Sequence, residues 1–108
     1  MLTRLAVFEG HITPGREEDF FAIVEHTLLP IWKRMPNATA VRVTRTLEPD
    51  ADAPPVVMVQ EVDYPSRAAL EQALASPVRL EGRVATQSLF SMFEGRFYHY
   101  VQERLSPG

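Results

Sequence analysis

The chain has 108 residues, of which 45% are hydrophobic and 23% charged, and a formal net charge of −3. This length is typical of one domain, expected here over residues 1–108, and the acidic balance with scattered arginines argues against a nucleic-acid partner. The absence of cysteine excludes disulfides and a thiolate nucleophile, and the lack of a signal peptide or of ~20 consecutive apolar residues favours a cytoplasmic protein with no membrane partner.

Residues 2–12 predict a strand with apolar side chains on both faces. Leu5 and Val7 lie on one face, since successive side chains of a strand alternate. Ala6 and Phe8 lie on the other face. Such a strand is expected to be covered on both sides.

Residues 14–35 predict a long helix, because apolar side chains recur at spacings of three and four. Thr13 is the expected N-cap. Pro30 lies inside this pattern, where it cannot donate a backbone hydrogen bond and crowds the preceding turn. We therefore expect a kink near residues 26–29, or a break followed by a second short helix.

Residues 40–48 and 56–64 predict two further strands, joined by a proline-rich connection as a hairpin. Ser66 is the expected N-cap of a second helix, which Ser76-Pro77 interrupts. The helix is expected to continue over residues 78–93 and to bury the apolar side chains Leu80, Val84, Leu89 and Phe93. Gly95 is expected to end it, and residues 96–104 predict the last strand.

The order β-α-β-β-α-β predicts an α+β, ferredoxin-like fold with a four-stranded antiparallel sheet and the helices on one face. The strands nevertheless carry apolar residues on both faces. A second copy of the same sheet would cover the free face, so we expect a homodimer that forms a barrel sheet to sheet.

Residues 57–77 hold a strand that ends in an acidic and aromatic cluster, then a Ser-capped helix and a Ser-Pro pair. This arrangement resembles the dimeric α/β barrel superfamily, and the chain is similar to its EthD-like, stress-responsive barrel and antibiotic-biosynthesis monooxygenase-like groups. Residues 24–30 resemble the helical His followed by Pro of EthD-like members. Ala73 stands where many monooxygenase-like members have a His, so haem ligation from that helix is not available.

The resemblance implies an enzyme that needs no cofactor, of the monooxygenase, isomerase or cyclase type, acting on a small apolar or aromatic molecule. The alternative is a non-catalytic small-ligand-binding or stress-associated dimer. A cavity between helices and sheet that is large enough for a ligand, with His26 pointing inward, would favour the enzyme, and a collapsed core with His26 facing solvent would favour the alternative. Fold alone does not choose between them.

His26 is the candidate catalytic residue, because a near-neutral imidazole suits proton transfer. The alternative is a histidine bonded to a backbone carbonyl that Pro30 leaves free. On the last strand, either His99 with Phe97 or the tyrosines Tyr98 and Tyr100 face the pocket, since alternate residues face opposite sides. The candidate substrate-binding residues are Phe8, Phe21, Trp32, Met58, Phe97 and His99.

No metal site is expected. His11, His26 and His99 lie on three different elements and have no ligand spacing such as His-x-x-x-His. Arg42 and Arg45 are expected on opposite faces of their strand, where they act separately.

Overall fold

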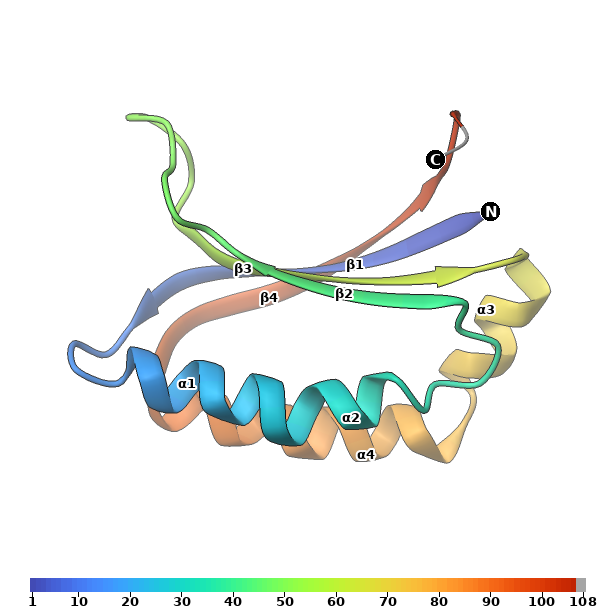
Figure 1. Ribbon diagram of the computed structural model, residues 1–108, viewed down its shortest axis with the longest axis horizontal. Coiled ribbons are helices and arrows are strands. Elements are labelled where there is room, and N and C mark those ends of the chain that lie inside the picture. The colour runs from blue at the N-terminus through green and yellow to red at the C-terminus, as the bar shows by residue number, and fades with distance from the viewer. Residues whose placement is uncertain (107–108) are drawn as a thin grey trace.

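The computed structural model describes residues 1–106 and contains one antiparallel sheet with helices on one of its faces (Figure 1). The sheet has four strands in the order β2-β3-β1-β4, as the predicted ferredoxin-like α+β fold requires. Its strands are β1 (Leu2–Ile12), β2 (Ala40–Arg45), β3 (Val56–Tyr64) and β4 (Phe93–Glu103). The helical elements are α1 (Glu17–Ile23), a π-helical turn η1 (Val24–Leu28), α2 (Leu29–Trp32), α3 (Arg67–Leu74), α4 (Pro77–Thr86) and a 3-10 turn η2 (Gln87–Ser91).

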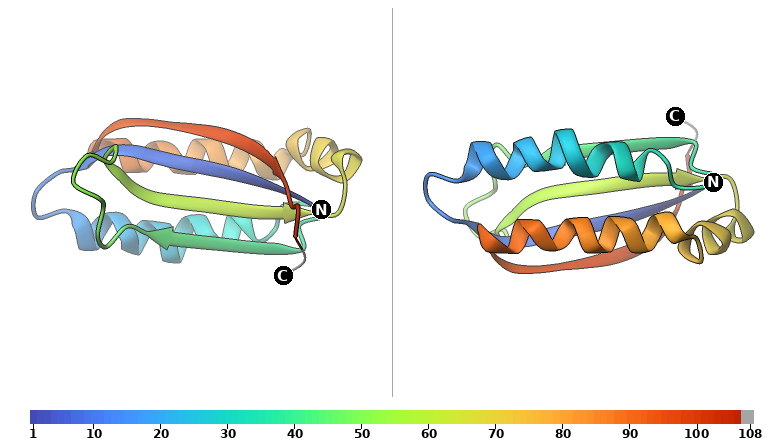
Figure 2. Two further views of the ribbon diagram at one scale, coloured as in Figure 1. Left: turned by 90° about the horizontal axis from the view of Figure 1, so that it is seen from above. Right: turned by 90° about the horizontal axis from the view of Figure 1, so that it is seen from below.

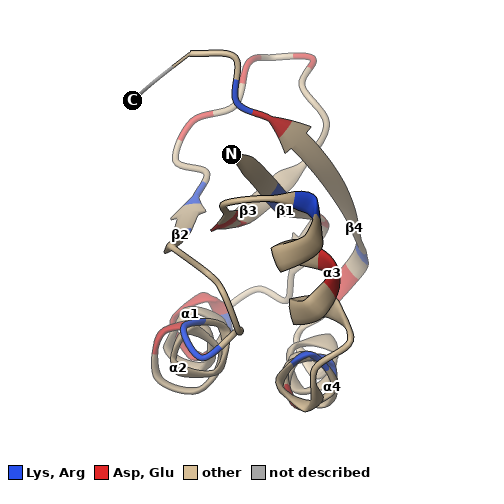
Figure 3. Ribbon diagram, turned by 90° about the vertical axis from the view of Figure 1, so that its right-hand side faces the viewer, with Lys and Arg blue, Asp and Glu red and all other residues tan. Residues whose placement is uncertain are grey.

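The helices form a single layer beneath the sheet. Figure 2 shows the α1–α2 helix and α4 side by side across that face, and Figure 3 shows the same two helices end on, below the strands. The main core fills the space between the layers and includes Phe8, Phe20, Leu28, Met58 and Leu89. Burial of these side chains is the principal force that holds helices to sheet.

The first helix is continuous from α1 to α2 but widens at η1. Pro30 lies in the first turn of α2, directly after the π-helical turn. The predicted irregularity near residues 26–29 therefore takes the form of a π-helical turn rather than a break. Such a turn accommodates one additional residue. It widens the helix just before Pro30, whose backbone nitrogen cannot donate a hydrogen bond.

Two predictions at the helix boundaries are wrong. The first helix begins at Glu17 and no side chain caps it, so Thr13 is not its N-cap. The second long helix ends at Thr86, and residues 93–95 already belong to β4, so Gly95 does not end a helix. Ser66, by contrast, caps α3 as predicted, since its side chain accepts a hydrogen bond from the Ala69 backbone N–H at 3.2 Å.

The predicted buried face of α4 is also wrong. Leu80 and Val84 are 64% and 60% exposed, whereas Gly82 and Thr86 are buried. The side of α4 that faces the sheet is therefore not its apolar side. Leu89 is fully buried in η2, and Phe93 is buried at the start of β4.

The outer face of the sheet, opposite the helices, carries aromatic and apolar side chains on its central strands. In the β1–β4 ladder Leu5 pairs with Tyr100 and Val7 with Tyr98. The connection between β2 and β3 and the end of β4 both rise above this face (Figure 1).

An ion cluster fixes one end of the outer face. The buried carboxylate of Asp63 accepts hydrogen bonds from Thr3 Oγ1 at 2.7 Å, from Arg42 at 2.8 and 2.9 Å, and from Arg104 at 3.2 Å. The Arg42 hydrogen bonds lower the pKa of Asp63 well below its usual range, against the opposing effect of burial. The cluster joins β1, β2 and β3 to the residue that follows β4.

Within residues 1–106, no helix has the length and apolar character needed to cross a membrane.

Candidate functional site

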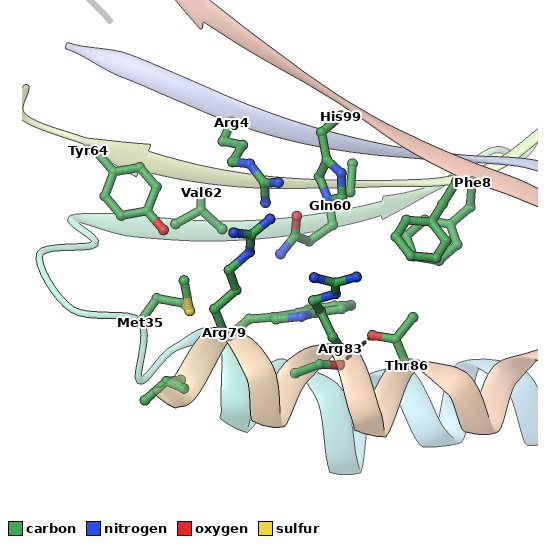
Figure 4. A pocket seen from close by; sticks show the side chains of 15 residues that line it. Arg4, Phe8, Met35, Gln60, Val62, Tyr64, Arg79, Arg83, Thr86 and His99 are labelled. Carbon is green, nitrogen blue, oxygen red and sulfur yellow. Dashed lines mark hydrogen bonds between the residues drawn. The ribbon is translucent and has the colours of Figure 1, made fainter. Parts of the chain in front are cut away.

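A cavity of about 280 Å³ lies between the sheet and α4 (Figure 4). This volume is close to the lower end of the range for small-molecule sites, about 300–1,000 Å³. Its residues come from three strands and two helical segments: Arg4, Ala6 and Phe8 of β1, Gln60, Val62 and Tyr64 of β3, Phe97 and His99 of β4, Trp32 and Met35 at the end of the first helix, and Val78, Arg79, Gly82, Arg83 and Thr86 of α4.

Local geometry explains why these residues meet. Alternate side chains of each strand point to the helices, so Arg4 shares a face with Ala6 and Phe8. On α4, Arg79 and Arg83 are one turn apart and face the sheet together. The remaining contributors from α4 are small, and this leaves space between the helix and the strands.

One end of the cavity is aromatic. The rings of Phe8 and Phe97 stack with centroids 5.3 Å apart, and Phe97 meets the His99 ring edge to face at 5.7 Å. Trp32 is buried and lies close to α4, where a β-carbon added to Gly82 would be 3.7 Å from its indole Nε1. Such a surface suits a flat apolar ligand.

The other end of the cavity is cationic. Figure 4 shows the guanidinium groups of Arg4 and Arg79 facing one another, with that of Arg83 extending from the next turn of α4. None of the described residues that line the cavity is acidic. Burial, and then the nearby Arg79, lower the pKa of Arg4 from its ordinary value.

His99 lies at the rim, between the aromatic and the cationic ends. Partial burial of its ring, and then the charges of Arg4, Arg79 and Arg83, lower its pKa to about 4. The imidazole is therefore neutral at neutral pH. A neutral imidazole accepts a proton at one nitrogen and donates a hydrogen bond from the other.

Tyr64 and Gln60 complete the polar lining. Burial raises the pKa of the Tyr64 hydroxyl, which stays protonated at neutral pH. Both side chains are buried on the helix-facing side of β3. They offer a hydroxyl and an amide to a ligand in addition to the guanidinium groups.

The structure brings together four of the predicted site residues. Phe8, Trp32, Phe97 and His99 all line the cavity, so His99 faces the helices together with Phe97, and the tyrosines lie on the outer face. Met58 is fully buried in the core and does not line the cavity.

The other two predicted residues, Phe21 and His26, lie elsewhere. Both line a separate groove between the first helix and the edge strand β2. His26 is exposed on the π-helical turn, and the guanidinium of Arg45 lies 5.2 Å from the centre of the Phe21 ring. The structure therefore does not bring His26 together with the aromatic cavity.

Sequence reasoning missed the three arginines of the cavity. A signal for Arg4 was available, because alternation places it on the face of Ala6 and Phe8. The four-residue spacing of Arg79 and Arg83 was likewise visible, but the apolar side chains of Leu80 and Val84 indicated the opposite face.

Within residues 1–106, no three His, Cys, Asp or Glu side chains come together in an arrangement that could hold a metal ion.

No family model matches the sequence, and a comparison with curated protein sequences finds no match. Solved structures are similar over almost the whole chain. An EthD family protein from Bacillus halodurans has a TM-score of 0.77 at 18% identity, covering 97% of this chain and 99% of its own. SnoaB, a cofactor-independent oxygenase from Streptomyces nogalater, has a TM-score of 0.64 at 19% identity, covering 98% and 94%.

A third solved structure, of an antibiotic biosynthesis monooxygenase, has a TM-score of 0.62 at 15% identity and covers 98% of this chain and 100% of its own. At these identities the similarity concerns the fold. The predicted order of strands and helices and the resemblance described for residues 57–77 agree with it. The chain therefore shares the fold of these three proteins, a four-stranded antiparallel sheet with helices on one face.

Proposed function

We propose that this protein is an enzyme that needs no cofactor and moves a proton on a small aromatic molecule held between the sheet and α4. The observation that carries this proposal is the position of His99, a neutral imidazole at the rim of an aromatic cavity. A titratable group with a strongly shifted pKa beside a cavity is typical of functional sites. The similarity in fold to SnoaB, a cofactor-independent oxygenase, supports an enzyme that works without a cofactor.

The proposed chemical step is removal of a proton from a carbon next to a carbonyl group. The His99 imidazole accepts the proton, and the electron pair of the broken C–H bond moves to the carbonyl oxygen, which becomes an enolate. The guanidinium groups of Arg4 and Arg79 stabilise that negative oxygen. In a conjugated substrate, return of the proton to the far carbon of the extended enolate completes an isomerisation. In a substrate with a second carbonyl, attack of the enolate carbon on that carbonyl closes a ring, and the resulting alkoxide oxygen takes the proton back from the His99 imidazolium.

Deuterium exchange tests this step without knowledge of the natural substrate. Phenylpyruvate has an aromatic ring and an enolisable carbon, and its exchange in D₂O is followed by proton NMR. We expect the protein to accelerate exchange and His99→Gln to slow it roughly a hundredfold. His26→Gln is the matched control, because His26 lies outside the cavity.

Two results would count against the proposal. Loss of exchange in His26→Gln with normal exchange in His99→Gln would transfer the catalytic role to the groove beside β2. Tight binding of phenylpyruvate without any accelerated exchange would instead support a non-catalytic binding protein.

We further infer that two copies pair through the outer faces of their sheets. Leu5 and Tyr98 are half-buried there beside the buried Val7, and the neighbouring Tyr100 is 53% exposed. Tyrosine is enriched at protein interfaces, and a second sheet would cover this surface. Light scattering should give the mass of a dimer, and Tyr100→Glu should give a monomer. Leu80→Glu, on the helical side, is the control that should stay dimeric.

A further inference from the structure

We infer that the ligand of the cavity is an aromatic molecule with an anionic oxygen group, which Arg4, Arg79 and Arg83 bind. This inference rests on the proposed function, since it takes the same cavity as the ligand site. It adds a second chemical requirement to the aromatic ring, a carboxylate or a phosphate.

The three guanidinium groups reach the same space from two sides. Arg4 comes from the centre of the sheet, and Arg79 and Arg83 come from successive turns of α4 (Figure 4). Arg79 also donates to the carbonyl oxygen of Leu74 at 3.3 Å, which holds its side chain against the end of α3. Planar guanidinium groups bind carboxylate and phosphate oxygens in pairs, and this convergence presents several donors to one group.

The surrounding protein does not neutralise these charges. Within residues 1–106, no carboxylate forms an ion pair with Arg4, Arg79 or Arg83. Glu81, on α4 between Arg79 and Arg83, binds Arg34 instead.

The three arginines of the cavity differ from most other arginines of the chain. The chain as a whole carries a net charge of −3, and five of its other arginines form ion pairs. Arg4, Arg79 and Arg83 have no such pairs, and all three line one partly buried cavity. Like charges in such a site repel one another and favour an incoming anion.

The chemistry of the neighbouring groups agrees with this arrangement. Burial and the neighbouring cations disfavour the charged forms of Arg4 and His99 and lower their pKa values. A bound anion would reverse the effect of the cations. The groups that face His99 are Arg4 from β1 and Arg79 and Arg83 from α4. Binding of an anion should therefore be accompanied by a rise in the pKa of His99.

The two ends of the cavity define the shape of the ligand. The stacked rings of Phe8 and Phe97 form the aromatic end, and Tyr64 lies beside the arginines at the other (Figure 4). A volume of about 280 Å³ admits one small ring system with a short acidic side chain.

A matched pair of ligands tests the inference. The probes are 3-phenylpropanoate and its neutral amide, with phenyl phosphate as a third arm that separates carboxylate from phosphate recognition. Trp32 is the only tryptophan of the chain and lines the cavity, so its fluorescence reports binding directly. We expect either anion to bind at least about tenfold more tightly than the amide, because charge-assisted hydrogen bonds to arginine are strong.

Variants assign this preference to the arginines. Arg79→Gln and Arg83→Gln should each reduce the preference for the anion severalfold while leaving the affinity for the amide unchanged. Arg83 is exposed on a helix, so its substitution should not impair folding. Arg67→Gln is the control, because Arg67 is exposed on α3 and does not line the cavity, and it should retain the full preference.

The outcomes separate this inference from the proposed function. Equal binding of anion and amide would overturn the anionic ligand but leave an aromatic ligand in place. Retention of the full preference in both Arg79→Gln and Arg83→Gln would also overturn it. Binding of none of the three probes would overturn the inference and count against the cavity as the functional site.

Discussion

Gly10 and Gly95 lie opposite one another in the β1–β4 ladder, and each occupies space that a side chain on the other would need. A β-carbon on Gly10 would overlap the carbonyl oxygen of Glu94, and one on Gly95 would overlap that of Glu9. Their φ angles of +152° and +155° are also ones that other residues rarely adopt.

Substitution of either glycine should therefore be costly. We expect Gly10→Ala and Gly95→Ala each to lower the free energy of unfolding by about 2 kcal/mol or more, from backbone strain and overlap together. Urea denaturation measures the free energy of unfolding of each variant. Gly15→Ala is the control, since Gly15 has a positive φ but nothing within 4 Å of its missing β-carbon. An equal loss in all three variants would show that φ alone is responsible.

Asp63 should be the most important carboxylate for stability. Asp63→Asn leaves Arg42 and Arg104 without their shared partner, and we expect a loss of about 2 kcal/mol in the free energy of unfolding. Asp19→Asn breaks an exposed pair with Arg16 and should change it by at most about 0.5 kcal/mol. Similar losses of unfolding free energy in Asp63→Asn and Asp19→Asn would contradict the expectation that a buried carboxylate contributes more to stability than an exposed one.

The pH dependence of the Asp63 contribution follows from its lowered pKa. The contribution is complete above the pKa of an unfolded aspartate, about 3.9, and is lost as the pH falls towards the lower value of the folded state. The stability difference between wild type and Asp63→Asn should therefore stay constant from pH 7 to pH 5.

His99 should make stability fall as the pH decreases. Its pKa is about 4 in the folded chain and about 6.5 when unfolded, so between these values the unfolded chain binds the proton and the folded chain does not. The ring is partly exposed, and the effect should therefore reach only about 1 kcal/mol. In His99→Gln this effect should be absent, so that stability falls less steeply between pH 7 and pH 4.5. His26→Gln should lose stability over this pH range as steeply as the wild type.

Gly82→Ala should separate stability from binding. The added methyl group would make ordinary contacts, 3.6 Å from Ile31 Cγ2 and 3.7 Å from Trp32 Nε1. Replacing a glycine within a helix should raise the free energy of unfolding by about 0.5–1 kcal/mol. Because Gly82 lines the cavity, the same methyl group should weaken binding of aromatic probes severalfold. A variant that gained stability and also bound more tightly would place the ligand elsewhere.

The sheet was predictable because strand periodicity is short and the neighbouring turns are distinct. Residues 2–12 and 56–64 form strands with the predicted bounds. Alternation also placed Arg42 and Arg45 on opposite faces, and they do interact separately, with Asp63 and with Phe21. These outcomes depend on local geometry alone.

The cavity was less predictable, because it violates the rule that apolar side chains face inward. On α4 the apolar Leu80 and Val84 are exposed, while Arg79 and Arg83 face the sheet. On a helix that faces a polar cavity, charged side chains point inward and apolar side chains point outward. Such departures from the usual pattern are expected at functional sites. His26 was chosen for its position before Pro30, but which way a side chain points after a π-helical turn requires the tertiary structure.

The π-helical turn also determines which residue of the first helix meets the cavity. It holds one residue more than an α-helical turn, which rotates everything after it by about 100°. Without that rotation Ile31 would occupy the position of Trp32, and an aliphatic side chain would line the cavity in place of the indole. The presence of an indole in the cavity thus depends on helical phase: one extra residue in the turn brings a flat aromatic side chain to the cavity where a regular helix would bring an aliphatic one.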